Sequence, residues 1–152
     1  MNIEIDVRGG TRTWDEDAIR ALSEHALRHM GVPDTCELSI SLVDLDEIHE
    51  LNREYRGIDS YTDVLSFPLD DPFDEALADE DSIEIGDVVI APDAVDEQRA
   101  QFGTSFEEEA SLMLVHSILH LLGYDHQSDE ERAQMEALEK EILDSYGITG
   151  VR

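Results

Sequence analysis

The sequence of 152 residues has few groups that could crosslink the chain or place it in a membrane. It contains a single cysteine, Cys36, which excludes a disulfide framework and a cysteine-cluster metal site. No apolar run approaches the roughly 18 to 20 residues of a membrane-spanning helix. The first residues, MNIEIDVRGG, lack the basic-then-apolar pattern of a secretory signal. We therefore expect a cytoplasmic protein that does not use a membrane.

Lysine is almost absent as well, since Lys140 is the only lysine among ten basic residues, against 38 acidic ones. The formal net charge of -28 at pH 7 makes the chain repel itself at low ionic strength. At about 1 M salt the Debye length falls to roughly 3 Å and the repulsion is screened. This composition favours a halophilic source, with an acidic protein from an ordinary bacterium as the alternative. The apolar fraction of 41% still suffices for a sizeable core, which argues against disorder.

Hydrophobic periodicity predicts that strands and helices alternate along the chain. Strands are expected at residues 2–7, 36–43, 61–67 and 84–90. Helices are expected to begin near Thr13, Asp44, Pro92, Ser105 and Ser128. The acidic stretch 70–82 is predicted to be an exposed loop. Because neither a repeat nor a linker is found, residues 1–152 are expected to form a single α+β domain, with a mixed sheet of about four strands packed with about five helices.

Three of these helices begin with a capping-box pattern, in which two side chains satisfy backbone donors at the helix start. The pairs are Thr13 with Glu16, Ser105 with Glu108, and Ser128 with Glu131. Core packing is expected for Cys36, Phe102 and Phe106, and Trp14 is expected to pack over its own helix.

The helix predicted from Phe106 to about Leu122 is apolar on almost every side, which places it in the interior of the protein. Two histidines, His116 and His120, interrupt it four residues apart, so their rings project from one face. Gly123 permits a sharp turn, and His126 completes the stretch HSILHLLGYDH. Imidazoles one turn apart can both reach one zinc ion at about 2.0 to 2.1 Å, with a third ligand returning from the loop. Three protein ligands leave a fourth position open, which is typical of catalytic zinc sites.

The histidine spacing matches the metalloprotease pattern HExxHxxGxxH at each histidine and at the glycine. A metalloprotease carries its general base, a glutamate, directly after the first histidine. This chain has Ser117 there, and a serine hydroxyl does not accept a proton at neutral pH as a carboxylate does. The pattern therefore predicts a metal site but not a peptidase of that type.

Three blocks of the sequence together resemble the YbeY family of bacterial endoribonucleases. They are LNREYRGIDSYTDVLSFP (residues 51–68), IGDVVIAP (residues 85–92) and HSILHLLGYDH (residues 116–126). The resemblance covers about residues 36–146 in the same order. Two positions depart from the family pattern, Ser117 in place of a glycine and Tyr61 where proline is common, but neither removes a ligand.

The resemblance implies one zinc ion per chain, held by His116, His120 and His126. It also implies cleavage of single-stranded RNA, maturation of ribosomal RNA (notably the 3′ end of the small-subunit RNA) and a part in ribosome quality control. The implied partners are the small ribosomal subunit and a ribosomal protein or ribosome-associated GTPase. The family's important arginine falls at Arg56, so Arg56 and His116 are the candidate catalytic residues.

Arg56 offers a planar fork of donors that suits phosphate oxygens. The alternative interpretation is an ordinary helix-end arginine that pairs with one of the many acids. Asp125 is the acid nearest the third ligand and is a candidate to orient a histidine. His25 and His29, a second pair at helical spacing, are interpreted as solvated surface residues. Structural roles are expected for the acids Asp63, Asp87 and Glu109, the last at the positive end of its helix dipole.

The net charge is the main objection to an RNA substrate, because phosphate contacts normally supply most of the affinity for nucleic acid. High salt, a locally positive groove at the metal and Arg56, or a protein partner would overcome the repulsion. Two other functions remain open. One is a metal-dependent hydrolase of another substrate, such as a peptidase with its base elsewhere. The other is a ribosome-assembly factor with a structural zinc ion, which a fourth protein ligand would favour.

Overall fold

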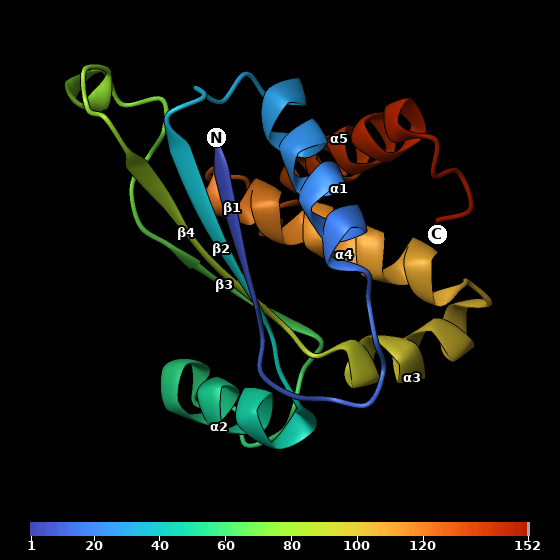
Figure 1. The fold of residues 1–152 in the computed structure, drawn as a ribbon. Coiled ribbons are helices and arrows are strands. Elements are labelled where there is room, and N and C mark those ends of the chain that lie inside the picture. The colour runs from blue at the N-terminus through green and yellow to red at the C-terminus, as the bar shows by residue number, and fades with distance from the viewer. Residues whose placement is uncertain (152) are drawn as a thin grey trace.

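A four-stranded mixed sheet with helices on both faces forms the framework of the computed structural model, which describes residues 1–151 (Figure 1). In chain order the elements are β1 (Asn2–Val7), α1 (Glu16–His29), β2 (Cys36–Leu42), α2 (Leu45–Arg56), β3 (Val64–Pro68), the 3₁₀ turn η1 (Glu75–Leu77), β4 (Ile83–Ile90), α3 (Pro92–Phe102), α4 (Phe106–Leu121) and α5 (Asp129–Tyr146). Within the described residues, the predicted α+β architecture of four strands and five helices is confirmed. Apart from η1, residues 70–82 lack regular helix, and the third strand begins three residues later than expected.

The strand order is β1-β2-β4-β3, with β1, β2 and β4 parallel and β3 antiparallel to β4. In β2 the alternation is strict. Cys36, Leu38, Ile40 and Leu42 are buried, and the residues between them are partly exposed. One face of β2 therefore contributes to the main core, as period-2 patterning predicts. Burial also raises the pKa of the Cys36 thiol.

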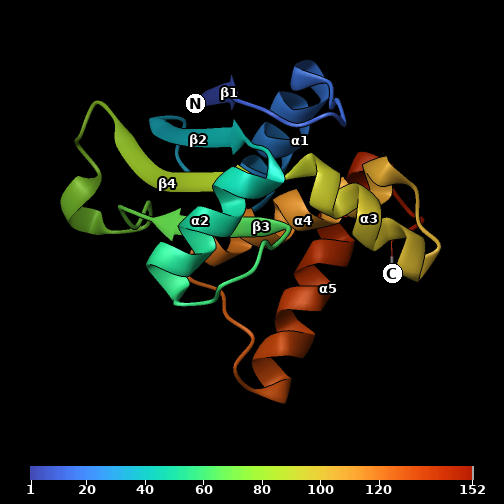
Figure 2. The same ribbon diagram turned by 90° about the horizontal axis from the view of Figure 1, so that it is seen from below.

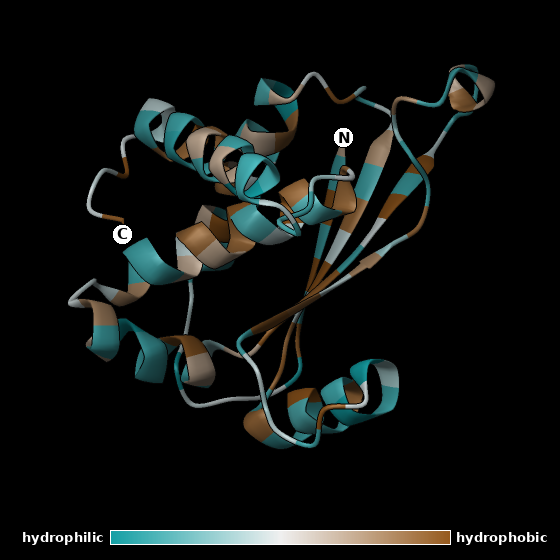
Figure 3. Cartoon of the chain, turned by 180° about the vertical axis from the view of Figure 1, so that it is seen from behind, coloured by the Kyte–Doolittle hydropathy of each residue, from teal (hydrophilic) through white to brown (hydrophobic). Residues whose placement is uncertain are grey.

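The helices form two unequal layers, seen from two directions in Figures 1 and 2. The main core lies between one face of the sheet and α1, α4 and α5, and α4 is buried along almost its whole length. α2 covers the opposite face through a smaller cluster made of Val43, Ile48, Leu65, Val89, Ala91 and Ala94. Colouring by hydropathy shows hydrophobic residues along the strands, whereas α2 and α5 carry alternating hydrophilic and hydrophobic bands (Figure 3). No helix among residues 1–151 combines the length and the apolar character needed to cross a membrane.

A β-bulge in β4 lets α4 lie close to the sheet. The register of β2 and β4 shifts at this point, so that Glu37 pairs with Glu84 but Leu38 pairs with Gly86. Gly86 has a φ of +147°, and a Cβ atom there would lie 2.4 Å from the carbonyl oxygen of Phe67 and 2.8 Å from the side chain of Leu121 on α4. Only glycine fits between these neighbours.

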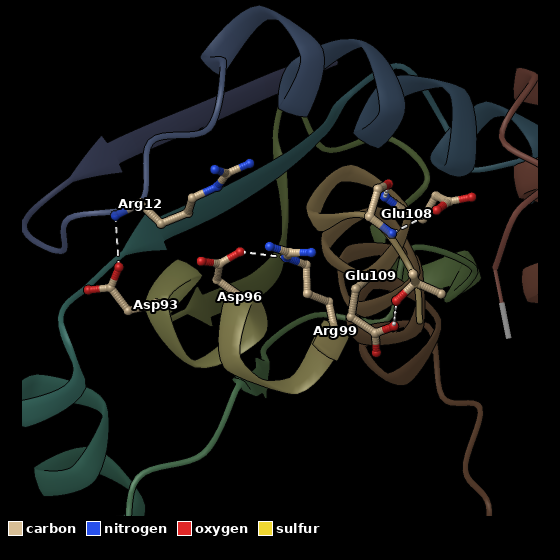
Figure 4. Close-up of polar contacts among 8 residues, drawn as sticks. Arg12, Asp93, Asp96, Arg99, Glu108 and Glu109 are labelled. Carbon is tan, nitrogen blue, oxygen red and sulfur yellow. Dashed lines mark hydrogen bonds and ion pairs between the residues drawn. The ribbon is translucent and has the colours of Figure 1, made fainter. Parts of the chain in front are cut away.

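The helix starts correct one prediction and confirm others. Asp15, not Thr13, is the N-cap of α1, because its carboxylate accepts a hydrogen bond from the Asp17 backbone. The predicted capping box at Thr13 is therefore wrong. Ser105 and Glu108 form the predicted box at α4 (Figure 4). Ser128 caps α5, but only half of that box is formed, since the Glu131 carboxylate accepts from the Ser128 hydroxyl rather than from its backbone.

The predicted packing of the aromatic residues is only partly correct. Trp14, directly before the N-cap of α1, packs edge-on against Phe106 of α4, with ring centroids 6.0 Å apart, a contact with a second helix that the sequence did not indicate. Phe106 is buried as expected. Phe102 is 46% exposed, because it lies in the last turn of α3, at the end farther from the sheet (Figure 1). The expectation of core packing is wrong for Phe102.

His25 and His29 are not simply solvated, because both hydrogen-bond to α5. His25 Nε2 lies 2.8 Å from the hydroxyl of Ser145, and His29 Nε2 lies 3.0 Å from a carboxylate oxygen of Glu141. The second histidine pair therefore joins α1 to α5 at the edge of the core, which corrects the sequence-based interpretation.

The loop between β1 and α1 is held to the start of α3 by one carboxylate, Asp93 (Figure 4). Asp93 accepts hydrogen bonds from the backbone of Thr11 at 3.0 Å, from the Thr11 hydroxyl at 2.9 Å and from the backbone of Arg12 at 2.7 Å. These bonds, the Thr11 backbone bond foremost, hold the pKa of Asp93 below its ordinary value of 3.8. The carboxylate therefore stabilises the folded chain in its ionised form.

We expect Asp93→Ala to lower the free energy of unfolding by about 1 to 2 kcal/mol, because the loop loses a charged acceptor. Since the folded-state pKa of Asp93 is depressed, its contribution is fully present above about pH 4 and is lost as the pH falls through that lower value. Denaturant unfolding of both proteins across the acidic range measures this. Asp96→Ala, which removes an exposed pair with Arg99, is the control and should cost less. A deficit for Asp93→Ala that does not shrink at acidic pH would contradict this account.

Candidate metal centre

Three histidine rings converge at one end of α4. His116 and His120 project from the helix, and His126 returns from the loop that follows it. One ligand nitrogen from each residue lies within 4.8 Å of the others. The ring centroids are 4.5 Å apart for His116 and His120, 5.5 Å for His116 and His126, and 5.1 Å for His120 and His126. The predicted convergence of the three rings is thus present.

A sharp turn at Gly123 brings the third histidine back to the other two. Gly123 has a φ of +99°, a conformation that favours glycine after a helix end. Its N–H donates to the carbonyl of His120 at 3.1 Å, and the N–H of Tyr124 donates to the carbonyl of Leu119 at 3.0 Å. Asp125 then accepts a hydrogen bond from the backbone N–H of His126 at 2.8 Å. Asp125 therefore positions the loop backbone, not a histidine ring as the sequence led us to expect.

In each of the two helical histidines, Nδ1 is hydrogen-bonded to the protein, which leaves Nε2 as the nitrogen that faces the other ring. His116 Nδ1 lies 2.5 Å from a carboxylate oxygen of Glu139, and His120 Nδ1 lies 3.0 Å from the carbonyl oxygen of Tyr124. Both neighbours are acceptors, so each Nδ1 carries a proton and donates it to its neighbour. The two Nε2 atoms, 3.0 Å apart, then present lone pairs to one another. A shared cation satisfies both, so the donor set fits a bound metal ion.

The environment of His120 also favours the ligating form. Burial, with the neighbouring His116 as the second cause, holds the pKa of His120 below its ordinary value of 6.5. A neutral imidazole is the form that binds a metal ion. His120 is therefore available as a ligand at neutral pH.

Glu139 is the functional residue that sequence reasoning missed. It lies on α5, 23 residues beyond His116, and its side chain is only 10% exposed. A local motif could not reveal it, because α5 meets α4 through tertiary packing. One signal was available, since Glu139 occupies a helix face shared with the buried residues Met135, Ile142 and Leu143. An acid on an apolar helix face needs a partner.

The three histidines open into a cavity of about 910 Å³ between the end of α2, β3, α4 and the first half of α5. Arg56, the last residue of α2, lines the same cavity. Tyr55 and Phe67 form an aromatic pair in its wall, with ring centroids 5.3 Å apart. Within residues 1–151 Arg56 forms no ion pair, so the helix-end pairing considered from the sequence is not present.

The position directly after His116, where a metalloprotease carries its glutamate base, is occupied by Ser117. Ser117 is fully buried, and its hydroxyl has no hydrogen-bond partner among the residues that the structure describes. Glu109, two helical turns before His116, is buried and accepts hydrogen bonds from Gln98 at 2.9 Å and Thr104 at 3.1 Å, the second of which is drawn in Figure 4. It lies in the first turn of α4 as predicted, but it also joins α4 to α3, which the sequence did not indicate.

The remaining singled-out positions lie around this site without joining the histidines. Asp63 lines the cavity and accepts a hydrogen bond from the backbone of Val64 at 2.9 Å, the turn role expected for it. Asp87 is exposed on β4. Tyr61 lies outside the cavity wall, and its hydroxyl donates to Glu97 of α3 at 2.6 Å.

A buried helix that carries two of three convergent histidines, beside an open cavity, defines an α+β protein with a candidate three-histidine metal centre. The family model for Endoribonuclease YbeY matches residues 4–147. The chain therefore belongs to the YbeY family of endoribonucleases, as the three sequence blocks indicated, and is placed among the nucleases.

Individual relatives agree over nearly their whole length. Endoribonuclease YbeY of Clostridioides difficile is 41% identical over 153 residues, which cover 98% of this chain and 99% of that protein. Endoribonuclease YbeY of Bacillus subtilis is 38% identical, with 97% and 98% covered. A solution structure of a Thermotoga maritima protein matches with a TM-score of 0.59 and 29% identity, covering 95% of this chain and 91% of that one.

We expect Glu139→Gln to weaken metal affinity by about 10- to 100-fold, because His116 loses the carboxylate that orients its ring. Competition with a chromogenic zinc chelator measures the change. Glu136→Gln is the matched control, since Glu136 lines the cavity one turn earlier on the same helix and is exposed. Equal affinities for Glu139→Gln and the unmodified protein would show that this contact does not support the metal.

Proposed function

We propose that this chain is a zinc-dependent endoribonuclease of the cytoplasm that cleaves single-stranded RNA. One zinc ion would be held by His116, His120 and His126. The substrate would be ribosomal RNA, notably the 3′ end of the small-subunit RNA, with a role in ribosome quality control. Its partners would be the small ribosomal subunit and a ribosomal protein or ribosome-associated GTPase. The observation that carries the proposal is the pair of facing Nε2 atoms, 3.0 Å apart, in the cavity of an endoribonuclease-family protein.

Zinc suits this donor set. Imidazole nitrogens bind zinc, as they bind copper, iron and nickel, whereas magnesium and calcium prefer oxygen ligands. No fourth His, Cys, Asp or Glu within residues 1–151 joins the group. A position left free for substrate supports a catalytic site over a structural one.

The bound cation would supply Lewis-acid polarisation of a phosphodiester oxygen. Glu139 keeps the Nδ1 proton of His116 in place, and the carbonyl of Tyr124 does the same for His120. Both rings are thereby fixed with their acceptor nitrogens toward the cavity. Arg56 presents its guanidinium from the cavity wall, where two of its donors can bind phosphate oxygens and the negative charge that develops on them.

A peptidase is the first competing function, and Ser117 argues against it. The residue that would be the general base is a buried serine without a hydrogen-bond partner in the described part of the chain. A ribosome-assembly factor with a structural zinc ion is the second. The open cavity at the histidines favours an enzyme over that function.

We expect the zinc-loaded protein to cleave a labelled single-stranded RNA, to cleave the same sequence at least tenfold more slowly as a duplex, and to leave casein intact. Chelation should abolish cleavage and added zinc should restore it. His126→Ala, which removes an exposed loop ligand, should lose zinc and activity, whereas His49→Ala, outside the cavity, should keep both. Cleavage of casein but not RNA would establish the peptidase, and zinc binding with no cleavage of either would favour the assembly factor.

We expect Arg56→Ala to bind zinc normally and to lower kcat for RNA by about 100-fold, the cost typical of removing one donor to a developing charge. Arg56→Lys should recover only part of the activity, since lysine lacks the planar fork. Arg53→Ala is the control, because Arg53 lies one turn earlier on α2, is exposed and lies 3.9 Å from Glu50. Cleavage by Arg56→Ala at the unmodified rate would remove Arg56 from the mechanism.

A further inference from the structure

Arg132, the fourth residue of α5, is a second cationic side chain in the cavity wall. It is exposed, and neither the histidine motif nor the block around Arg56 contains it. In a chain with 38 acidic residues, the surroundings of each cation decide whether it is available to a ligand.

Almost every other basic side chain in the described part of the chain is already engaged. Pairs with acids are formed by Arg8 with Glu47, Arg20 with Asp17, Arg28 with Glu24, Arg53 with Glu50, Arg99 with Asp96 and Lys140 with Asp144. Arg12 lies over the ring of Phe106, 4.2 Å from its centroid. Within residues 1–151, the two basic side chains without either kind of partner are Arg56 and Arg132. Both line the cavity of the candidate metal centre.

The lack of a partner at Arg132 is not due to a shortage of acids nearby. Asp129 lies three residues before it, the spacing at which Arg20 pairs with Asp17, and Glu136 lies four residues after it. Helical pairs at these spacings are common. The structure nevertheless directs Arg132 into the cavity wall without an ion pair to either acid. Its guanidinium therefore keeps all its donors for a ligand.

The two arginines reach the cavity from opposite sides. Arg56 ends α2, and Arg132 lies in the first turns of α5, which packs on α4 and α1. Figure 1 shows α2 and α5 on opposite sides of the sheet. The histidines line the same cavity from α4 and its following loop. A chain of phosphates that crosses the metal centre would meet one arginine on each side. The acids Glu136 and Glu139 also line the cavity, so a polyanion needs local positive charge to enter it.

We propose that Arg132 is a positioning residue that binds a phosphate of the RNA strand on the opposite side of the metal centre from Arg56. This inference rests on the proposed endoribonuclease function and adds a contact to its substrate. The contact holds the strand across the site and takes no part in the bond cleavage. Its loss should therefore appear in substrate binding, not in the chemical step.

The test compares Arg132→Ala with the unmodified zinc-loaded protein in steady-state cleavage of single-stranded RNA. KM should rise about fivefold, the scale of one exposed charge pair, while kcat stays within about twofold. Arg132→Lys should recover most of the loss, and Arg132→Glu should enlarge it. Lys140→Ala is the control, since Lys140 is on the same helix and pairs with Asp144 outside the cavity. Zinc affinity and melting temperature should be unchanged in all four variants.

A binding measurement separates this inference from the proposed function. The probe is a fluorescein-labelled single-stranded DNA of the same base sequence, which carries phosphates but is not the substrate of an endoribonuclease. Arg132→Ala should weaken its binding about fivefold and reduce the slope of log K against log salt by about 0.7, the value for one lost phosphate contact on a single strand. Equal binding and equal KM for Arg132→Ala and the unmodified protein would overturn the role of Arg132 even if RNA is cleaved. An unmodified protein that binds the probe through Arg132 but cleaves no RNA would overturn the proposed function alone.

Discussion

The burial of α4 between the sheet and α5 is the constraint on which the rest of the structure depends. A helix that is apolar on nearly every side must be covered on every side, and β3, β4, α1, α3 and α5 provide that cover. The same packing removes water from one side of the imidazoles and brings Glu139 against His116. The contacts that bury α4 therefore also orient one ring of the candidate metal centre.

How much was predictable from sequence depended on how far apart the interacting residues are. The histidine cluster follows from a four-residue helical spacing and a glycine turn, which are local, so the sequence alone was sufficient. Glu139 lies on the next helix, α5, and no local sequence pattern predicts its contact with the ring of His116. The prediction of the N-cap of α1 was wrong for a different reason. Thr13 and Asp15 are both good N-cap residues, and the packing of Trp14 on Phe106 accompanies the start of the helix after Asp15.

The fold class followed from the alternation of strands and helices, but the details of exposure did not. Phe102 is apolar and lies next to a helix junction, yet it is exposed because α3 runs away from the sheet. The sequence predicts surface positions for His25 and His29, because their own helix is polar on that side. The partner helix, which supplies Ser145 and Glu141, changes their role. Amphipathic patterns identify a buried face, but they do not identify the neighbours of a half-buried one.

The bulge at Gly86 has a consequence for how such a centre tolerates change. Gly86 donates no ligand and lies on a strand, yet the backbone of β3 on one side and Leu121 on the other leave no room for a methyl group. Leu121 directly follows His120. A side chain added at Gly86 would therefore displace α4 next to His120 and change the orientation of its ring. Mutational surveys confined to imidazoles and carboxylates would overlook this position. The alignment of the histidine rings therefore depends in part on the absence of a Cβ atom at Gly86.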